Sequence, residues 1–303
     1  MAHGTRRPIM VGYDGSEASR QALGWGIKEA RLRHVPLRLV HAFHWPVEEI
    51  YVPPGRLSMR RIMTEARDQA ATWFAGQVRE AVDAAPDVEV SGAFEELAPG
   101  RLLVDASREA EMMVVGSRGL GGFTGLLLGS VSVQLAAHAA CPVFVHRAVT
   151  QESGPPRVVV GVDGSTRSDV AVRLAFEEAA LRGAPLEAVH AWTHPVATGP
   201  GDSLPLVMDP YIVAQDAQAM LSECLAGYGE KYPEVPVTQT VAREHASKAL
   251  LDAARRATVV VVGSRGHGGL TGLLLGSTCH ALLHHATCPV LVARGYGGAR
   301  RDH

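Results

Sequence analysis

The sequence predicts two α/β domains, each a five-stranded parallel sheet covered by helices on both faces. Two observations lead to this prediction. Motifs recur at a nearly constant offset, since VGYDGS at 11–16 returns as VGVDGS at 160–165 and CPVFVHR at 141–147 returns as CPVLVAR at 288–294. In each copy, short apolar runs alternate with helical segments, which is typical of parallel, doubly covered sheets.

The repeat also sets the expected domain bounds. We expect a first domain at 1–148, a linker at 149–156, a second domain at 157–295 and a tail at 296–303. Each copy has an ordinary domain size. The stretch VTQESGPPR at 149–157 has the polar and proline content of a connector.

The elements of the first copy follow from its apolar pattern. Ser16 is the predicted N-cap of the first helix, which Gly24 and Gly26 weaken, and Pro99 falls in the first turn of the third. The fourth strand is apolar throughout, as expected for burial on both faces. The predicted strands cover 8–14, 35–43, 88–94, 111–116 and 141–147, and the predicted helices cover 16–34, 57–85, 98–110 and 130–140. In the second copy the loop at 193–210 is longer, and it could cover a ligand or be tolerated surface variation.

Composition and charge exclude several classes of protein. Residues 1–150 carry 16 basic and 16 acidic residues and residues 151–303 carry 13 and 15, so neither half has the basic excess of a nucleic-acid binder. No apolar run is long enough to cross a membrane, and the N-terminus lacks the apolar core of a signal peptide. Four cysteines do not form a disulfide framework in a chain of 303 residues. We therefore expect a cytoplasmic protein that binds neither nucleic acid nor membrane.

A glycine-rich loop follows the fourth strand of each copy. It reads GSRGLGGFTGLLLGS at 116–130 and GSRGHGGLTGLLLGS at 263–277, and a helical segment follows it. Glycines allow backbone N–H groups to approach an oxyanion, and a helix start favours negative charge. Ser130 and Ser277 would add a hydroxyl, and Arg118 and Arg265 a positive charge. The alternative is a tight glycine turn without a ligand. No P-loop lysine motif and no G-x-G-x-x-G after the first strand is present.

An aspartate ends the first strand of each copy, Asp14 and Asp163, inside the pattern G-x-D-G-S. Such a carboxylate could bond a ribose hydroxyl or a base, or hold Mg²⁺ with the phosphates. The alternative is an ordinary aspartate that caps a strand-to-helix turn. If the strand order is 3-2-1-4-5, the first and fourth strands flank the crevice where ligands of open α/β sheets bind. Asp14 would then face the loop that begins at Gly116.

These motifs, together with VHA after the second strand and the final CPV strand, resemble those of a tandem universal stress protein over nearly all of the chain. The resemblance implies two doubly wound domains of strand order 3-2-1-4-5 and, where the glycine motif is intact, ATP binding. The expected nucleotide contacts of the first half are Gly12, Asp14, Val40, Gly116, Ser117, Arg118, Gly119, Leu120, Gly121, Gly122, Gly129, Ser130, Val131 and Ser132. Those of the second half are Gly161, Asp163, Val189, Gly263, Ser264, Arg265, Gly266, His267, Gly268, Gly269, Gly276, Ser277 and Thr278.

The second copy departs from the first directly after the loop. Ser130-Val131-Ser132 becomes Ser277-Thr278-Cys279, so the second site loses a hydroxyl that would contact phosphate. A few residues later, cysteines and histidines gather in a spacing that matches no standard zinc pattern, and the first copy does not share most of them. We therefore predict no metal beyond Mg²⁺ bound with ATP through Asp14 and Asp163. The residues of this cluster are Cys279, His280, His284, His285 and Cys288.

The function predicted from the sequence is that of a regulator that binds ATP once per domain and acts on unidentified protein partners. No recognisable nucleophile, general base or paired carboxylates occur, so no catalytic residue is assigned and any hydrolysis should be slow. Two alternatives stay open: an ATP-consuming enzyme, either an ATPase or a phosphoryl-transfer protein, and an interaction scaffold with vestigial pockets. The last strands, PVFV and PVLV, lie at sheet edges in this topology, so we expect the halves to pair there about a pseudo-twofold axis. Assembly into a homodimer is undetermined.

Overall fold

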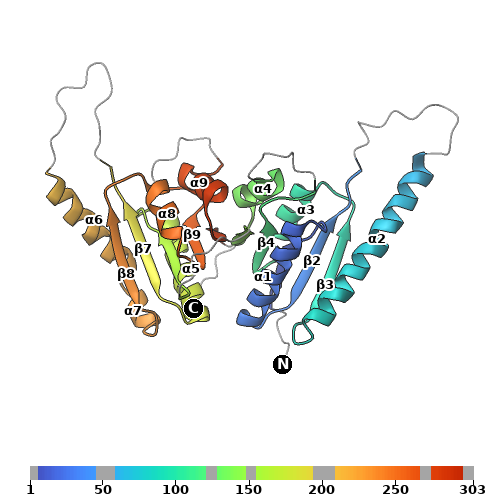
Figure 1. Cartoon of the computed structure of the whole chain (residues 1–303), viewed down its shortest axis with the longest axis horizontal. Coiled ribbons are helices and arrows are strands. Elements are labelled where there is room, and N and C mark those ends of the chain that lie inside the picture. The colour runs from blue at the N-terminus through green and yellow to red at the C-terminus, as the bar shows by residue number, and fades with distance from the viewer. Residues whose placement is uncertain are drawn as a thin grey trace, which may run out of the picture. The chain divides into compact units, whose positions relative to one another are not determined.

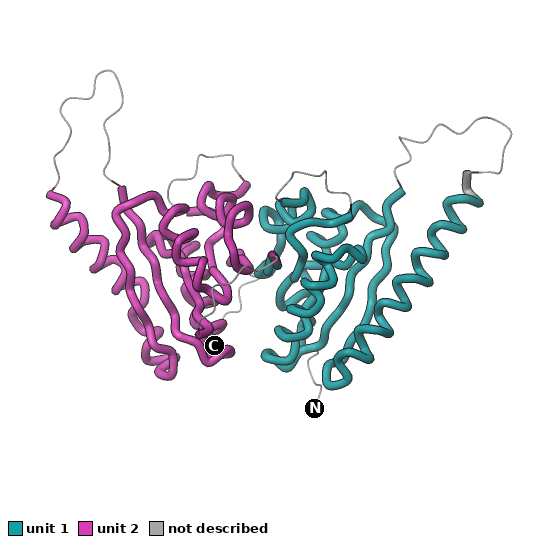
Figure 2. Tube along the Cα trace, viewed as in Figure 1, with its two compact units in different colours: residues 1–146, 296–303 teal, residues 147–295 magenta. Residues whose placement is uncertain are grey.

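The structure, a computed structural model, describes residues 6–45, 59–120, 128–147, 155–193, 209–266 and 274–295. The chain divides into two compact units with a boundary between His146 and Arg147 (Figure 2). Most of the predicted linker at 149–156, the tail at 296–303 and most of the loop at 193–210 lie outside the described residues. The predicted pairing of the two halves through their last strands stays a prediction.

The first unit is an α/β fold with the predicted strand order. All its strands are parallel and follow the order β3-β2-β1-β4-β5 (Figure 1). In the central register, Ile9 pairs with Leu37 on one side and with Met112 on the other. The strands are β1 (Ile9–Gly12), β2 (Leu37–Ala42), β3 (Val90–Glu95), β4 (Met112–Gly116) and β5 (Val143–His146), and the helices are α1 (Glu17–Arg33), α2 (Met59–Ala84), α3 (Pro99–Ala106) and α4 (Ser130–His138).

The second unit repeats this topology, with parallel strands in the order β8-β7-β6-β9-β10. One short helix, α7, is added after α6. The strands are β6 (Val158–Gly161), β7 (Leu186–Ala191), β8 (Val237–Ala242), β9 (Val259–Gly263) and β10 (Val290–Ala293), and the helices are α5 (Thr166–Arg182), α6 (Pro210–Leu225), α7 (Tyr228–Lys231), α8 (Ala246–Ala254) and α9 (Ser277–His285). The sequence repeat is therefore also a structural repeat.

Helices cover both faces of the first sheet, as two successive residues of β1 show, since neighbouring strand residues point to opposite faces. Gly26 of α1 lies so close to Val11 of β1 that a Cβ on the glycine would stand 2.5 Å from the Val11 Cγ2 atom. A Cβ on the next strand residue, Gly12, would instead stand 2.9 Å from Leu103 of α3. Helices α1 and α3 therefore lie on opposite faces. The prediction that Gly26 weakens the first helix missed its role, which is to let α1 approach the sheet closely.

The central strands form the core, and the helix ends follow the predicted capping. Every residue of β4 and β5 is buried, whereas β3 at the sheet edge is only half-buried. The Ser16 hydroxyl accepts a hydrogen bond from the Ser19 backbone N–H at 3.2 Å, which confirms the predicted N-cap of α1, and Ser165 caps α5 in the same way. Pro99 opens α3 as predicted. These caps fix where the strand ends turn into helices, and the candidate sites lie at those turns.

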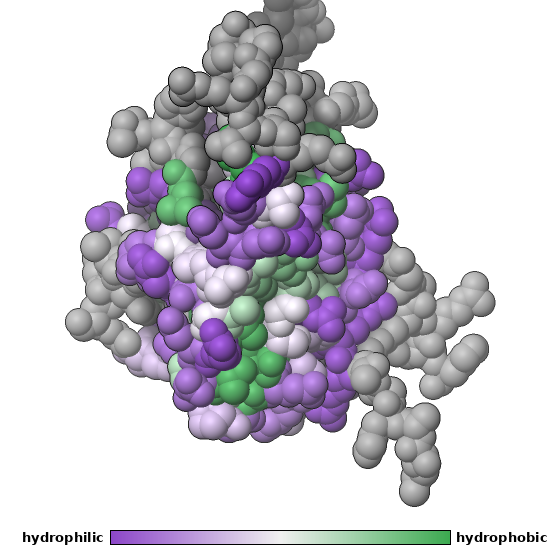
Figure 3. All heavy atoms as spheres, turned by 90° about the vertical axis from the view of Figure 1, so that its right-hand side faces the viewer, coloured by the Kyte–Doolittle hydropathy of each residue, from purple (hydrophilic) through white to green (hydrophobic). Residues whose placement is uncertain are grey.

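The surface of the described residues is mainly polar on the face of the first unit that carries α2, with a narrow hydrophobic strip (Figure 3). The large apolar side chains that α2 exposes are those of Ile62, Trp73 and Val82. No apolar segment long enough for a membrane occurs among the described helices.

Candidate functional site

A pocket of about 500 Å³ lies at the carboxyl ends of the strands in the first unit. Its position between β1 and β4 is the point where the strand order reverses, which is the usual ligand position in open α/β sheets. Its volume is within the range of small-molecule sites. It is lined by Gly12, Tyr13, Asp14, Ser19, Val40, His41, Ala42, Pro99, Leu103, Val115, Gly116, Arg118, Gly119, Leu120, Leu128, Gly129, Ser130, Val131 and Ser132.

Most of the predicted residues of the first site therefore line one pocket. Ser117 is buried behind it, and Gly121 and Gly122 lie outside the described residues. Sequence reasoning missed the apolar and aromatic lining, chiefly Tyr13, His41, Pro99 and Leu103. The family resemblance that pointed to Val40, and the strand end that pointed to Asp14, carried no signal for the residues that α3 contributes.

Asp14 joins the turn after β1 to the glycine loop. One carboxylate oxygen, Oδ1, accepts a hydrogen bond from the Ser16 backbone N–H at 3.0 Å, and the other, Oδ2, accepts one from the Leu120 backbone N–H at 2.8 Å. The predicted approach of Asp14 to the glycine loop is thereby confirmed. Asp14 caps the strand-to-helix turn, as the alternative reading expected, and also ties the loop to it. Its contact with a ribose hydroxyl, a base or Mg²⁺ stays a prediction.

The glycine at 119 is required by this contact. A Cβ on Gly119 would stand 2.5 Å from the Asp14 Oδ2 atom, closer than real Cβ atoms come to their neighbours. Glycine is therefore needed at this position because the Asp14 carboxylate leaves no room for a side chain. In the second unit, a Cβ on Gly266 would stand 2.3 Å from the Asp163 Oδ2 atom. The two copies thus share the same close approach of loop and aspartate.

The same hydrogen bonds set the charge of Asp14. Burial acts to raise the pKa of this carboxyl, but hydrogen bonds from Ser16, Leu120 and Ser19 outweigh it, so the pKa lies below its ordinary value. A carboxylate that accepts backbone N–H bonds is stabilised in its charged form. Asp14 is therefore a fixed negative charge at neutral pH and a poor proton acceptor.

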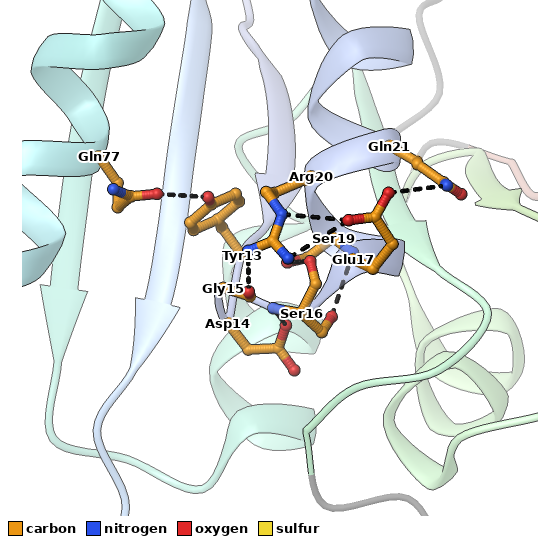
Figure 4. Close-up of polar contacts among 9 residues, drawn as sticks. All are labelled: Tyr13, Asp14, Gly15, Ser16, Glu17, Ser19, Arg20, Gln21 and Gln77. Carbon is orange, nitrogen blue, oxygen red and sulfur yellow. Dashed lines mark hydrogen bonds and ion pairs between the residues drawn. The ribbon is translucent and has the colours of Figure 1, made fainter.

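The turn that presents Asp14 is also supported by side chains of α1 and α2 (Figure 4). Gly15 has a φ of 83°, and a Cβ there would stand 2.7 Å from the Trp73 ring of α2. The Arg20 guanidinium donates to the Gly15 carbonyl at 2.5 Å, and the Tyr13 hydroxyl donates to the Gln77 side-chain oxygen at 2.6 Å. The position of Asp14 thus depends on α1 and α2, a support that no sequence motif announced.

Helix α4 begins directly at the pocket. The Gly129 backbone N–H donates to the Ser117 carbonyl at 2.8 Å, which closes the glycine loop, and the helix starts at the next residue. The first backbone N–H groups of a helix have no partner within the helix, so the start of α4 presents donors to the pocket. Arg118 is exposed at the pocket edge. These groups together form an end of the pocket suited to an anion.

Ser132 lines the pocket as predicted, and its buried hydroxyl also has a partner within the protein. It donates to the Gly116 carbonyl at 2.8 Å and so ties α4 to the end of β4. In the second unit the same position is Cys279, a buried thiol whose pKa burial raises to about 12. The exchange of serine for cysteine therefore removes a structural hydrogen bond of the kind that Ser132 makes.

Exchanging these two side chains should have opposite effects on the two units. We expect Ser132→Cys to destabilise the first unit by about 1 kcal/mol and Cys279→Ser to stabilise the second by a similar amount, since a hydroxyl donates more strongly than a thiol. Thermal unfolding of each variant measures both effects. If the hydroxyl serves the ligand instead, Ser132→Cys would lower ligand affinity tenfold or more with unchanged stability, which would contradict the structural role.

The second unit has a corresponding pocket of about 400 Å³. Asp163 accepts hydrogen bonds from the Ser165 backbone N–H at 3.0 Å and from the Ser165 hydroxyl at 2.7 Å, and Gly276 donates to the Ser264 carbonyl at 2.8 Å. His267, Gly268 and Gly269 lie outside the described residues, and the other predicted residues except Ser264 line the pocket. Its lining is Gly161, Val162, Asp163, Ser168, Val189, Ala191, Ala246, Leu250, Val262, Gly263, Arg265, Gly266, Leu275, Gly276, Ser277, Thr278 and Cys279.

The two pockets differ in their surroundings. Where the first unit has Tyr13 and Arg20, the second has Val162 and Asp169. Arg265 donates to the Leu274 carbonyl at 3.3 Å, so its side chain bridges the two limbs of the glycine loop. We therefore expect the two sites to share a binding mode but to differ in affinity.

Comparison with known proteins gives the same picture for both halves. Residues 5–147 and residues 155–294 each match the model of the universal stress protein family. The universal stress protein Rv2005c of Mycobacterium tuberculosis is 39% identical over 290 residues, which cover 94% of this chain and 96% of that protein. A universal stress protein of Mycolicibacterium smegmatis is 36% identical, with 96% of this chain and 98% of that protein covered. Among solved structures, a universal stress protein from Archaeoglobus fulgidus has a TM-score of 0.69 at 21% identity and covers 96% of this chain and 99% of its own.

Proposed function

Because the chain belongs to the universal stress protein family, whose members act in the stress response, we propose that each unit binds ATP in its pocket and that the nucleotide acts as a regulatory signal. The observation that carries this proposal is the contact between Asp14 and the glycine loop. It holds the loop against the start of α4, so that an anion-binding end and an apolar cavity belong to one pocket. The second unit repeats the arrangement.

The lining residues divide the pocket into two chemically different parts. At the phosphate end, the backbone N–H groups of Ser130 and Val131 at the start of α4 would bind phosphate oxygens, and Arg118 would supply positive charge. At the other end, Val40, Leu103 and Val115 give apolar surface that suits a purine ring. Glycine at position 119 keeps this arrangement intact, because a side chain there would collide with Asp14 and displace the glycine loop.

The residues that line the pocket favour binding of the nucleotide over its hydrolysis. Among the described lining residues of the first pocket, Asp14 is the only carboxylate, and both of its oxygens already accept backbone N–H bonds. Its lowered pKa makes it a weak general base. Hydrolysis would then be slow, and the bound nucleotide would act through its different affinity for two conformations or two partner surfaces.

Magnesium is compatible with this arrangement but has limited access to Asp14. Each carboxylate oxygen keeps a lone pair beyond the one used for an N–H group, so the aspartate could still reach a Mg²⁺ ion that the phosphates hold. We propose that positioning the loop is the main role of Asp14, and of Asp163 in the second unit. A Mg²⁺ ion bound with the nucleotide would mainly neutralise the phosphates.

Calorimetric titration of nucleotide-free protein with ATP tests the proposal. We expect up to two ATP molecules per chain, and a turnover in single-turnover assays with labelled ATP that is slow relative to nucleotide release. Absence of ATP binding would refute the proposal. Fast hydrolysis that Asp14→Ala and Asp163→Ala abolish would favour an ATP-consuming enzyme instead.

A further inference from the structure

Helix α9 carries two histidines one turn apart, His280 and His284. His280 is exposed and His284 is partly exposed, and their ring centroids lie 4.3 Å apart with an angle of 30° between the ring planes. Residues four positions apart on a helix lie on the same face, so both rings can reach one ion. A pair of histidines with this spacing contributes two metal ligands in the H-E-x-x-H helices of metalloproteases.

The separation of the rings fits joint coordination. If both imidazoles bind one ion, metal–nitrogen bonds of about 2.0–2.1 Å place the ring centroids roughly 4.5 Å apart at adjacent octahedral positions and about 5 Å apart at tetrahedral ones. The observed 4.3 Å is close to the first of these values. The rings are therefore close enough for both to bind one ion once their nitrogens turn towards it.

The other members of the cluster do not belong to this pair. Cys279 and Cys288 are buried, and burial raises the pKa of each thiol to about 12, which disfavours the thiolate that a metal requires. In the part of the chain that the structure describes, no group of three or more potential ligands stands around a common point. A site built on His280 and His284 would therefore be completed by water.

We propose that His280 and His284 form a two-ligand site for a divalent transition ion of the Ni²⁺, Cu²⁺ or Zn²⁺ class. Imidazole is a preferred ligand of these ions, whereas Mg²⁺ and Ca²⁺ prefer oxygen. The ion would link successive turns of α9, a helix of nine residues. A ligand that binds only the folded state stabilises it, so the ion should raise the stability of the second unit.

This site would be specific to the second unit. In the first unit the positions that correspond to His280 and His284 are Val133 and Ala137, so α4 has no pair, although His138 corresponds to His285. The opening of α9 at Ser277 lies against the second pocket. Only this consequence rests on the proposed function: an ion that stabilises α9 would also stabilise the nucleotide-binding end of that pocket.

Titration with Ni²⁺ alone tests the site, in full-length protein that carries no histidine tag and no nucleotide. Ni²⁺ is suitable because it favours nitrogen ligands and its paramagnetism broadens the NMR signals of bound imidazoles. We expect one dominant Ni²⁺ site per chain by calorimetry and selective broadening of His280 and His284. Either His280→Gln or His284→Gln should weaken binding roughly tenfold or more, because the second imidazole acts as an intramolecular ligand. Ni²⁺ should also raise the melting temperature of the second unit in the parent protein but not in His280→Gln or His284→Gln.

The matched controls are His138→Gln on α4 and His285→Gln on α9, both of which should bind Ni²⁺ as the parent protein does. Circular dichroism without metal establishes that every variant is folded. Unchanged Ni²⁺ affinity in His280→Gln and His284→Gln, or broadening confined to other histidines, would overturn the proposal. Because no nucleotide is present, this result is independent of whether the pockets bind ATP.

Discussion

Replacing Gly119 with alanine is expected to weaken ATP binding to the first pocket by roughly 10- to 100-fold, since about 1.5–3 kcal/mol is lost with a hydrogen bond to a charged group. The added methyl carbon would stand 2.5 Å from the Asp14 Oδ2 atom, so the loop or the carboxylate must move. That movement breaks the bond between Asp14 and the Leu120 backbone N–H. Gly266→Ala should have the same effect on the second pocket, where the distance is 2.3 Å.

Calorimetric titration of the two single variants and the double variant assigns each lost site to its unit. The matched control is Gly24→Ala on α1, where a Cβ would have no neighbour within 4 Å. That control should leave ATP binding unchanged and stabilise the helix by about 0.5–1 kcal/mol. If both loop variants bind ATP as tightly as the control, the nucleotide must bind elsewhere.

Replacing Asp14 with alanine is expected to abolish measurable ATP binding in the first unit and to destabilise that unit by about 1.5–3 kcal/mol. The variant leaves the Ser16 and Leu120 backbone N–H groups without their acceptor, so the turn and the glycine loop separate. Asp14→Asn keeps one acceptor oxygen and should have an intermediate effect. Asp83→Asn, on the exposed surface of α2, is the control and should change neither quantity.

The contribution of Asp14 to the free energy of unfolding should depend on pH in the acid range. Because its pKa in the folded state lies below the ordinary value of 3.8, its stabilising effect is complete above that pH and is lost as the pH falls through the folded pKa. The difference in unfolding free energy between the parent protein and Asp14→Asn should therefore be constant at higher pH and shrink below about 3.8. Urea unfolding at a series of pH values measures it. A difference that grows on acidification would contradict the hydrogen bonding seen around Asp14.

Much of the fold follows from features that act locally. The Ser16 cap, Pro99 in the first turn of α3 and the fully apolar β4 were all predicted correctly, because capping and two-sided burial leave direct marks in sequence. The strand order confirms the expectation taken from the family resemblance. It also explains why Asp14 meets the glycine loop 106 residues later in the chain.

What the sequence did not reveal depends on packing between distant elements. The turn at Gly15 is held by Trp73, Arg20 and the Tyr13–Gln77 hydrogen bond, contacts between α1, α2 and β1 that no motif encodes. The Ser132 hydroxyl was expected to contact phosphate, and Ser132 does line the pocket, but no motif indicated that its hydroxyl donates to the Gly116 carbonyl. A motif identifies which residue types recur, but tertiary packing decides which of their groups remain available to a ligand.

The ligand itself is the most direct test of the central claim. The protein should be purified under native conditions, denatured, and the released small molecules identified by mass spectrometry. We expect an adenine nucleotide, at no more than two molecules per chain, and a reduced amount from the Gly119→Ala, Gly266→Ala double variant. Protein that releases no nucleotide and also fails to bind added ATP would contradict the claim that the two pockets are nucleotide sites.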